Sequence, residues 1–254
     1  MNKINIMKKK NMKIKLVIFD MAGTTVKDKN EVTGCFLEAA SRTGLNTNKN
    51  EVDRLHGIPK KKVFQLLWEE RIGKGSNKFE TYVNKSFETF KDILESHYLS
   101  TDIEPTEGCL ELFRSLKTKN IFIGLNTGFY RKVTNIILKN LGWDLGLNDN
   151  YVGGSSSIID VSVTPSEIYN NEGRPSPYMI QKAMYVLGID DPKSVVVIGD
   201  TPSDLKSGVS AGCLKSFAVT NGTHSKEELE AYKNDGLFSS LNEFSSYLNQ
   251  FIDV

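Results

Sequence analysis

The sequence predicts an α/β fold, in which a Rossmann-like, doubly wound parallel sheet carries an all-helical cap domain inserted after its first strand. Two features of the sequence indicate this fold. Short runs that are apolar at nearly every position recur along the chain, and such runs are typical of strands buried on both faces of a parallel sheet. Helical periodicity separates these runs, except in residues 28–102, which contain helical patterns alone.

Five segments are predicted to be strands. The strongest candidates are Ile14–Phe19, Ile121–Leu125 and Ser194–Ile198, because each is an apolar run that ends in a polar turn. Ile158–Val163 and Ser216–Val219 are weaker candidates. In an open parallel sheet, ligands bind outside the carboxyl ends of the strands. The residues that follow these runs are therefore the first candidates for a functional site.

Helices are predicted where apolar residues share one face of a 3.6-residue period. One such face follows the second strong strand, and another precedes the third. Their members are Thr134, Ile137, Leu138 and Leu141 in the first, and Ile180, Ala183, Met184 and Leu187 in the second. Alternation of strands with helices of this kind favours a sheet that is wound on both sides.

Residues 28–102 are predicted to form a separate helical cap domain, so that the core domain comprises residues 14–27 and 103–254. Residues 1–13 are rich in Lys and Asn and are predicted to be a disordered basic tail, with Met7 and Met12 as alternative start residues. The helical patterns of the cap are marked by Cys35, Ala39 and Ala40, by Val63, Leu66 and Leu67 after Pro59, and by Phe79, Val83, Phe87, Phe90 and Leu94.

The composition narrows the class of protein. The chain has 254 residues and a formal net charge of +1, from 32 basic and 31 acidic residues. This balance argues against a nucleic-acid surface, which needs a basic excess. No apolar run approaches the roughly 18 residues that span a bilayer, and no secretory signal is recognised. Three widely separated cysteines fit reduced thiols, so we expect a cytoplasmic protein with no membrane or nucleic-acid partner.

The strongest chemical signal follows the first predicted strand. Asp20 stands at the end of this strand, and Gly23 and Thr24 follow it closely. Glycine lets the backbone turn tightly, and the amides and hydroxyls beyond it can hold phosphate oxygens. The alternative is an ordinary strand-to-loop turn in which Asp20 is only a capping residue.

Polar residues in three further loops fit the same edge of the sheet. Thr127 and Gly128 follow the second strand, and Asp200 and Asp204 follow the third. Arg174 lies in a loop between them, and its guanidinium can fork onto phosphate. Two carboxylates at this edge suit Mg²⁺, which prefers oxygen ligands. Each feature has an ordinary alternative, namely a turn, a solvated surface charge or an N-capped helix, but together they indicate a site for Mg²⁺ and a phosphoryl group.

In this order, these residues resemble the haloacid dehalogenase superfamily, and the helical insert resembles its lid of the first type. The resemblance covers nearly all of the chain after the tail. It implies that Asp20 is a nucleophile that forms an aspartyl-phosphate, and that Thr127 and Arg174 bind the phosphoryl group. Phosphoryl transfer depends mainly on positioning and charge neutralisation, which such residues can supply.

The same resemblance implies a Mg²⁺ site formed by Asp20, the backbone carbonyl of Ala22 and Asp200, with Asp204 in support. Typical phosphatases of this superfamily carry a second Asp two residues after the nucleophile, which protonates the leaving oxygen. Here that position is Ala22, which cannot transfer a proton. Alanine there, and arginine rather than lysine at position 174, are similar to the phosphonoacetaldehyde hydrolases, or phosphonatases.

In phosphonatases a lid lysine forms a Schiff base with the substrate aldehyde, so that the carbon leaving group departs as an enamine and needs no acid. The resemblance of the segment His56–Lys62 places Lys60 at this position. A neutral amine is required for attack, and burial near Lys61 and Lys62 would lower the pKa of Lys60. The alternative is that these lysines form the solvated start of a helix.

The chain departs from the phosphonatase pattern at two positions. Met21 stands where phosphonatases have Trp, and Val63 stands where they have a His that assists proton transfer at the lysine. The second difference puts the Schiff-base step in question. His56, four residues before Lys60, is either a substitute from a neighbouring turn or an exposed polar residue.

We therefore predict a Mg²⁺-dependent hydrolase that cleaves the carbon–phosphorus bond of phosphonoacetaldehyde to acetaldehyde and phosphate. Gly23, Thr24, Gly128 and His56 are the predicted substrate-binding residues. The first alternative is a phosphatase of a small phosphate ester. A non-catalytic phospho-ligand sensor is disfavoured, because the nucleophile and its partners are all present. The expected partner is a small phosphonate or phosphate, and the resemblance also allows a homodimer formed through the cap.

Overall fold

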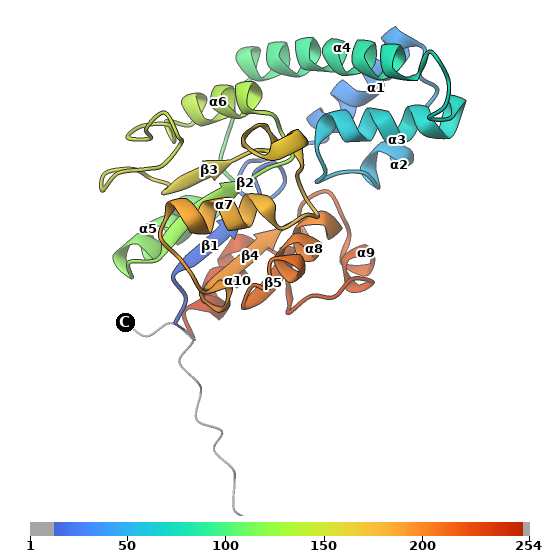
Figure 1. Cartoon of the computed structure of the whole chain (residues 1–254). Coiled ribbons are helices and arrows are strands. Elements are labelled where there is room, and N and C mark those ends of the chain that lie inside the picture. The colour runs from blue at the N-terminus through green and yellow to red at the C-terminus, as the bar shows by residue number, and fades with distance from the viewer. Residues whose placement is uncertain (1–12, 251–254) are drawn as a thin grey trace, which may run out of the picture.

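The computed structural model describes residues 13–250, and it shows a parallel sheet beneath a group of helices (Figure 1). The predicted tail, apart from Lys13, lies outside the described residues, as do the alternative start residues Met7 and Met12. The strands are β1 (Leu16–Phe19), β2 (Phe122–Asn126), β3 (Val161–Val163), β4 (Val195–Gly199), β5 (Lys215–Val219) and β6 (Leu237–Phe238).

The six strands pair in parallel in the order β3-β2-β1-β4-β5-β6, which confirms the predicted Rossmann-like, doubly wound class. Strand β1 is central, because it pairs with β2 on one side and with β4 on the other. The chain crosses from one half of the sheet to the other after β3. Ligands bind at such a crossing in open α/β sheets, so the end of β1 is the expected place for a site.

The bounds of β1, β2, β4 and β5 differ from the prediction by at most two residues, and the other two strands differ more. Strand β3 begins at Val161 rather than at Ile158, because the side chain of Asp160 takes over part of the pairing. Its carboxylate accepts the amide of Ile123 at 2.8 Å and pairs with Lys117 at 2.6 Å. Strand β6, of two residues, was not predicted, since so short a segment has no measurable period.

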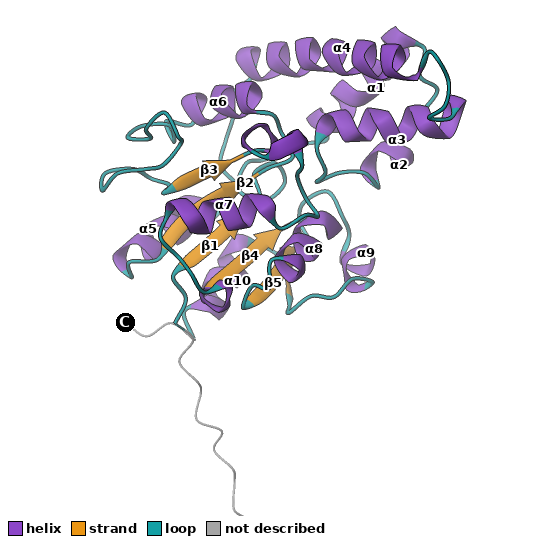
Figure 2. Ribbon diagram, viewed as in Figure 1, coloured by secondary structure: helices purple, strands orange, loops and turns teal. Residues whose placement is uncertain are grey.

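Helices cover both faces of the sheet, as expected from the alternation of side chains along each strand (Figure 2). Leu16 and Ile18 belong to one apolar cluster, with residues of α7 (Tyr178–Val186). Val17 and Phe19 belong to another, with residues of α5 (Cys109–Thr118) and α10 (Leu241–Leu248), and Phe19 lies edge-on to Phe113 at 5.2 Å between ring centroids. The core helices are α5 (Cys109–Thr118), α6 (Arg131–Asn140), α7 (Tyr178–Val186), α8 (Pro202–Ser210), α9 (Lys226–Glu230) and α10 (Leu241–Leu248).

The helices between β1 and α5 pack around an aromatic centre. The rings of Phe36 and Phe90 stack at 4.2 Å, and Phe64 lies 5.1 Å from Phe36. Full burial of such a ring contributes roughly 1.5–3 kcal/mol. Helix α2 is short and was not predicted. We call these four the cap helices: α1 (Glu31–Thr43), α2 (Lys49–Asp53), α3 (Lys60–Ile72) and α4 (Phe79–Ser100).

The two connections between the sheet core and the cap helices lie side by side. Val26 and Pro105 form an antiparallel bridge, and the amide of Lys27 donates to the carbonyl of Glu104 at 3.0 Å. This pairing places the cap helices over the carboxyl ends of the strands (Figure 1). The site at the end of β1 is therefore covered by a second layer of the protein.

No helix within residues 13–250 has the length and apolar content needed to cross a membrane. The three cysteines, Cys35, Cys109 and Cys213, are buried and carry free thiols.

Candidate active site

Asp20 occupies the first residue after β1, where the structure fixes both its backbone and its carboxylate. Its amide donates to the carbonyl of Ile198 at 3.0 Å, and the hydroxyl of Thr25 donates to its carbonyl at 2.8 Å. Only 4% of the residue is exposed. Burial raises the pKa of Asp20 to about 6, and the nearby Asp200 adds to this shift, whereas Arg174 opposes it.

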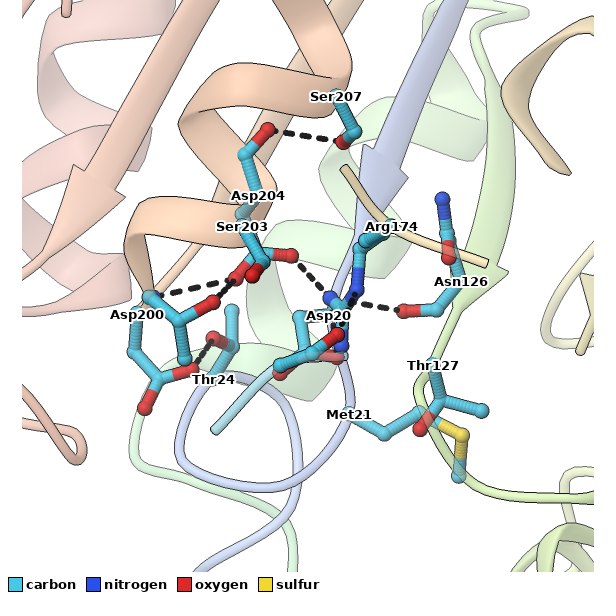
Figure 3. Close-up of polar contacts among 12 residues, drawn as sticks. Asp20, Met21, Thr24, Asn126, Thr127, Arg174, Asp200, Ser203, Asp204 and Ser207 are labelled. Carbon is cyan, nitrogen blue, oxygen red and sulfur yellow. Dashed lines mark hydrogen bonds and ion pairs between the residues drawn. The ribbon is translucent and has the colours of Figure 1, made fainter. Parts of the chain in front are cut away.

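Arg174 lies among the carboxylates of the core (Figure 3) and also contacts the cap. Its Nη1 donates to the Oδ1 of Asp20 at 2.7 Å and also pairs with Asp204. Its Nε donates to the carbonyl of Gly57, in the loop before α3, at 2.8 Å. A buried guanidinium is costly unless it is paired and hydrogen-bonded, and these contacts meet both conditions. The predicted surface-charge alternative for Arg174 is wrong, because only 3% of the residue is exposed.

Three carboxylates meet beside this guanidinium. Oxygen atoms of Asp20, Asp200 and Asp204 all lie within 4.8 Å of one another, and all three residues are buried. Burial raises the pKa of Asp200, and its repulsion from Asp204 contributes to the same shift. One guanidinium cannot balance three carboxylates. A buried, oxygen-rich set of ligands with unbalanced negative charge fits a hard divalent cation such as Mg²⁺.

Asp204 also caps a helix. Its Oδ2 accepts the amide of Thr201 at 3.1 Å and the hydroxyl of Thr201 at 2.6 Å, in a capping box at the start of α8. Thr201 is thus the N-cap residue of α8, and Asp200 does not cap this helix. The side chain of Asp200 instead accepts the amide of Thr223 at 2.7 Å. The sequence did not indicate Thr223, although Asn221-Gly222 before it is a turn signal.

The loop after Asp20 is held together by hydrogen bonds between its own amides and carbonyls. The amide of Gly23 donates to the carbonyl of Val26 at 2.8 Å, and the amide of Thr24 donates to the carbonyl of Met21 at 3.1 Å. The hydroxyl of Thr24 donates to Asp200 at 3.3 Å. The donors expected for phosphate oxygens are therefore occupied within the core. Gly23 has a φ of 86°, and a Cβ there would clash with the carboxylate of Asp200, so glycine is required for this close approach.

A small closed cavity of about 20 Å³ lies between the cap helices and the core. This volume holds about one water molecule, so a substrate can enter only if the cap helices move away from the core. Glycine permits the tight fit, since a Cβ on Gly128 would come within 2.6 Å of the carbonyl of Ile58. The predicted site residues that line the cavity are Asp20, Ala22, His56, Lys60, Thr127, Gly128 and Arg174.

Lys60 points into this cavity from the first residue of α3. Its Nζ lies 4.9 Å from the ring centroid of Phe129 and 5.8 Å from that of Phe36, and 7% of the residue is exposed. Burial lowers the pKa of Lys60 to about 8, and the charge of Arg174 contributes. The solvated-helix alternative is therefore wrong for Lys60.

The cause of this low pKa differs from the prediction. Lys61 and Lys62, which were expected to lower it, are exposed to solvent. The shift matters for chemistry, because a pKa of about 8 leaves about one tenth of the amine of Lys60 neutral at pH 7. An ordinary lysine would be neutral in about one molecule in three thousand.

His56 is neither exposed nor cationic. Only 7% of it is exposed, and its Nε2 lies 3.0 Å from the hydroxyl of Thr33. Burial and the charge of Lys60 lower the pKa of His56 to about 3. A ring that stays neutral near pH 7 cannot supply a proton as an imidazolium, so the exposed alternative is wrong and the proton-transfer alternative loses support.

Asp28 is a cavity residue that the sequence assigned only to the edge of the cap. It follows the first connection, lines the closed cavity together with Lys60, and accepts the amide of Glu31 at 2.9 Å. Nothing in the pattern distinguished it from an ordinary linker carboxylate. Phe129 also lines the cavity and was not predicted to do so, because an aromatic residue after a turn is usually interpreted as part of the hydrophobic core.

A larger, open pocket of about 1050 Å³ adjoins the closed cavity. His56 and Arg174 line both spaces. The pocket is bounded by the start of α3, the loop before α7, and the segments around α8 and α9.

Comparisons with known proteins agree with this architecture. The family model of the haloacid dehalogenase-like hydrolases matches residues 14–212. The phosphonoacetaldehyde hydrolase of Bacillus cereus (strain AH820) is 30% identical over 235 residues, which cover 86% of this chain and 82% of that protein.

A bifunctional phosphonoacetaldehyde hydrolase/aminoethylphosphonate transaminase of Clostridioides difficile (strain 630) is 30% identical over 237 residues. These cover 86% of this chain, which spans only about one third (34%) of that longer relative. Among solved structures, a phosphonoacetaldehyde hydrolase-like protein from Oleispira antarctica superimposes with a TM-score of 0.74 at 18% identity, over 99% of this chain and 96% of that one. At this identity the structural likeness shows the fold alone.

Proposed function

The chain belongs to the haloacid dehalogenase-like hydrolase family, in its phosphonoacetaldehyde hydrolase-like branch, and on this basis we propose that it cleaves the carbon–phosphorus bond of phosphonoacetaldehyde. The products are acetaldehyde and phosphate. One observation carries the choice of substrate: the buried amine of Lys60 shares a closed cavity with the carboxylate of Asp20. Hydrolysis of a phosphate ester includes no step in which a neutral amine beside the nucleophile takes part.

The proposed reaction uses two covalent steps. The neutral amine of Lys60 condenses with the substrate aldehyde and forms an iminium, which withdraws electrons from the neighbouring carbon. Asp20 then attacks phosphorus, and the electron pair of the carbon–phosphorus bond moves into an enamine on Lys60. Because this leaving group is carbon, no acid is needed at Ala22, which lines the same cavity. Water then hydrolyses the phosphoryl group on Asp20, which regenerates the carboxylate and releases phosphate and one proton. The enamine carbon takes up one proton, and a second water releases acetaldehyde from the resulting iminium.

Arg174 and Thr127 are proposed to hold the phosphoryl group. Arg174 pairs with Asp20 in this structure, so the guanidinium already lies beside the attacking oxygen. Thr127 lines the cavity, and its hydroxyl oxygen accepts the amide of Phe129 at 3.2 Å, which leaves the hydroxyl proton available to a ligand. Both contacts would neutralise charge on the transferred group.

Asp20, Asp200 and the carbonyl of Ala22 are proposed to hold Mg²⁺, with Asp204 orienting Arg174. The three-carboxylate cluster supports this assignment. Bound Mg²⁺ would offset charge on the phosphoryl oxygens and on the attacking carboxylate.

Removal of metal is expected to stop the reaction. Treatment with EDTA should reduce phosphate release to background, and added Mg²⁺ should restore it, because the carboxylates of Asp20 and Asp200 otherwise repel each other and the substrate. The measurement is the initial rate of phosphate release before and after dialysis against chelator. Undiminished turnover in metal-free buffer would rule out the metal assignment.

The proposed substrate is tested with a panel. The protein is incubated with phosphonoacetaldehyde and, separately, with small phosphate esters, and both phosphate and acetaldehyde are measured. We expect equal amounts of the two products from phosphonoacetaldehyde. Phosphate release from esters alone would contradict carbon–phosphorus cleavage.

A phosphatase of a small phosphate ester is the second candidate. It is favoured by the open pocket of about 1050 Å³ beside the cavity, which offers room for a leaving group larger than acetaldehyde. Turnover of an ester that is unaffected by loss of the Lys60 amine would support this candidate.

A further inference from the structure

Formation of an iminium needs a proton donor beside the lysine. The carbonyl oxygen of the aldehyde leaves as water and must receive two protons, of which the attacking amine supplies one. Val63 and Ala22 cannot transfer protons, and the neutral ring of His56 holds no imidazolium proton. The proposed reaction therefore requires a donor that the sequence pattern did not supply.

Asp28 is placed to fill this role. It lines the closed cavity together with Lys60 and Asp20, although the three residues come from different segments of the chain. The paired connections hold it near the core, and its Oδ1 accepts the amide of Glu31 at the start of α1. Among the residues that the structure describes, no cation forms an ion pair with Asp28. Its carboxyl group is thus fixed in position but not neutralised.

We propose that Asp28 is the acid–base group for the iminium on Lys60, a role that rests on the proposed carbon–phosphorus cleavage. The carboxyl of Asp28 gives its proton to the carbonyl oxygen as the amine forms the carbon–nitrogen bond. It then takes one proton from the nitrogen and returns it to the hydroxyl group, which departs as water. Asp28 ends as a carboxylate beside the iminium cation. During hydrolysis of the iminium the same carboxylate accepts a proton from the attacking water, and the cycle closes.

The electrostatic surroundings suit both forms of this carboxyl. Burial, together with the neighbouring Glu31, raises the pKa of Asp28 to about 7. Four other ionisable groups interact with the carboxyl of Asp28. They are Asp200 of the core, Lys60 of α3, Cys35 of α1 and Tyr98 of α4. The pKa values of the last two are raised, so they stay neutral.

The test compares Asp28→Asn with the unchanged protein in the presence of phosphonoacetaldehyde, Mg²⁺ and borohydride. Asparagine keeps an oxygen that can accept the amide of Glu31, so the start of α1 is preserved, but it cannot give up a proton. We expect the initial rate of trapped adduct on Lys60 to fall by about 100-fold, the usual contribution of a positioned acid or base.

The pH profile separates this role from a structural one. In the unchanged protein the trapping rate should rise up to about pH 7, as Lys60 becomes neutral, and fall above about pH 8, as the protonated form of Asp28 is depleted. The alkaline fall should disappear in Asp28→Asn. The matched control Glu31→Gln removes a neighbouring charge that raises the pKa of Asp28, so it should keep a bell-shaped profile, with a lower maximum and an optimum at lower pH.

Three results would overturn the proposal. A trapping rate in Asp28→Asn within about threefold of the unchanged protein, measured on variants with the same thermal midpoint, excludes proton transfer by Asp28. An equal loss on a phosphate ester shows that the residue serves a step other than the iminium. Absence of any adduct in the unchanged protein overturns the proposed function itself, and the Asp28 assignment with it, so the two failures are distinguishable.

Discussion

Replacement of Asp20 by Asn is expected to abolish turnover, with a loss of at least roughly 10⁴-fold, as seen when a covalent nucleophile is removed. Asparagine has nearly the same shape as aspartate, but its amide cannot attack phosphorus. The burial that positions Asp20 would hold the asparagine in the same place. The measurement is phosphate release from phosphonoacetaldehyde at saturating Mg²⁺.

The fold should survive this change. The raised pKa of Asp20, about 6, means that its carboxylate is less favourable in the folded protein than in the unfolded chain, so a neutral amide should not lower the thermal midpoint in metal-free buffer. Asp149→Asn, at an exposed position, is the matched control and should keep full activity. Activity of Asp20→Asn within about tenfold of the unchanged protein, or about 1.4 kcal/mol of activation free energy, would contradict the assignment of Asp20 as the nucleophile.

Lys60→Arg is expected to eliminate carbon–phosphorus cleavage, with a loss of at least roughly 10³-fold, or about 4 kcal/mol of activation free energy. Arginine keeps the positive charge, but its guanidinium stays protonated and cannot form an iminium. The measurement is acetaldehyde formation from phosphonoacetaldehyde, together with the thermal midpoint, because a larger side chain must fit between Phe36 and Phe129.

Lys60→Met controls for packing, since it is similar in length and removes both charge and amine. If only charge mattered, Lys60→Arg would stay partly active while Lys60→Met would not. If the amine is a covalent participant, both variants lose carbon–phosphorus cleavage equally. Unchanged turnover of phosphonoacetaldehyde by Lys60→Arg would refute the iminium, and would leave the chemistry of Asp20 standing without it.

The sequence was most informative about the sheet and the residues at its edge. Strands buried on both faces are apolar throughout, so β1, β2 and β4 could be recognised and their polar ends compared. The structure brings Asp20, Asp200 and Asp204 together as parallel strand ends require. Lys60 could be placed only by resemblance, because nothing in Lys60-Lys61-Lys62 reveals which side chain is buried.

Properties that depend on tertiary contact could not be predicted. The low pKa of Lys60 comes from burial and Arg174, whereas the adjacent lysines are solvated. The neutral state of His56 depends on its burial and on the charge of Lys60. Asp28 gains its place in the cavity from the pairing of two connections that are far apart in the chain.

The chemical form of the adduct on Lys60 tests the central claim most directly. The protein is turned over with phosphonoacetaldehyde and Mg²⁺, quenched with borohydride, digested and analysed by mass spectrometry. After the carbon–phosphorus bond has broken and the enamine has been protonated, the iminium carries two carbons and no phosphorus. Its reduction should leave an ethyl group on Lys60. Release of phosphate with Lys60 unmodified throughout would contradict the account.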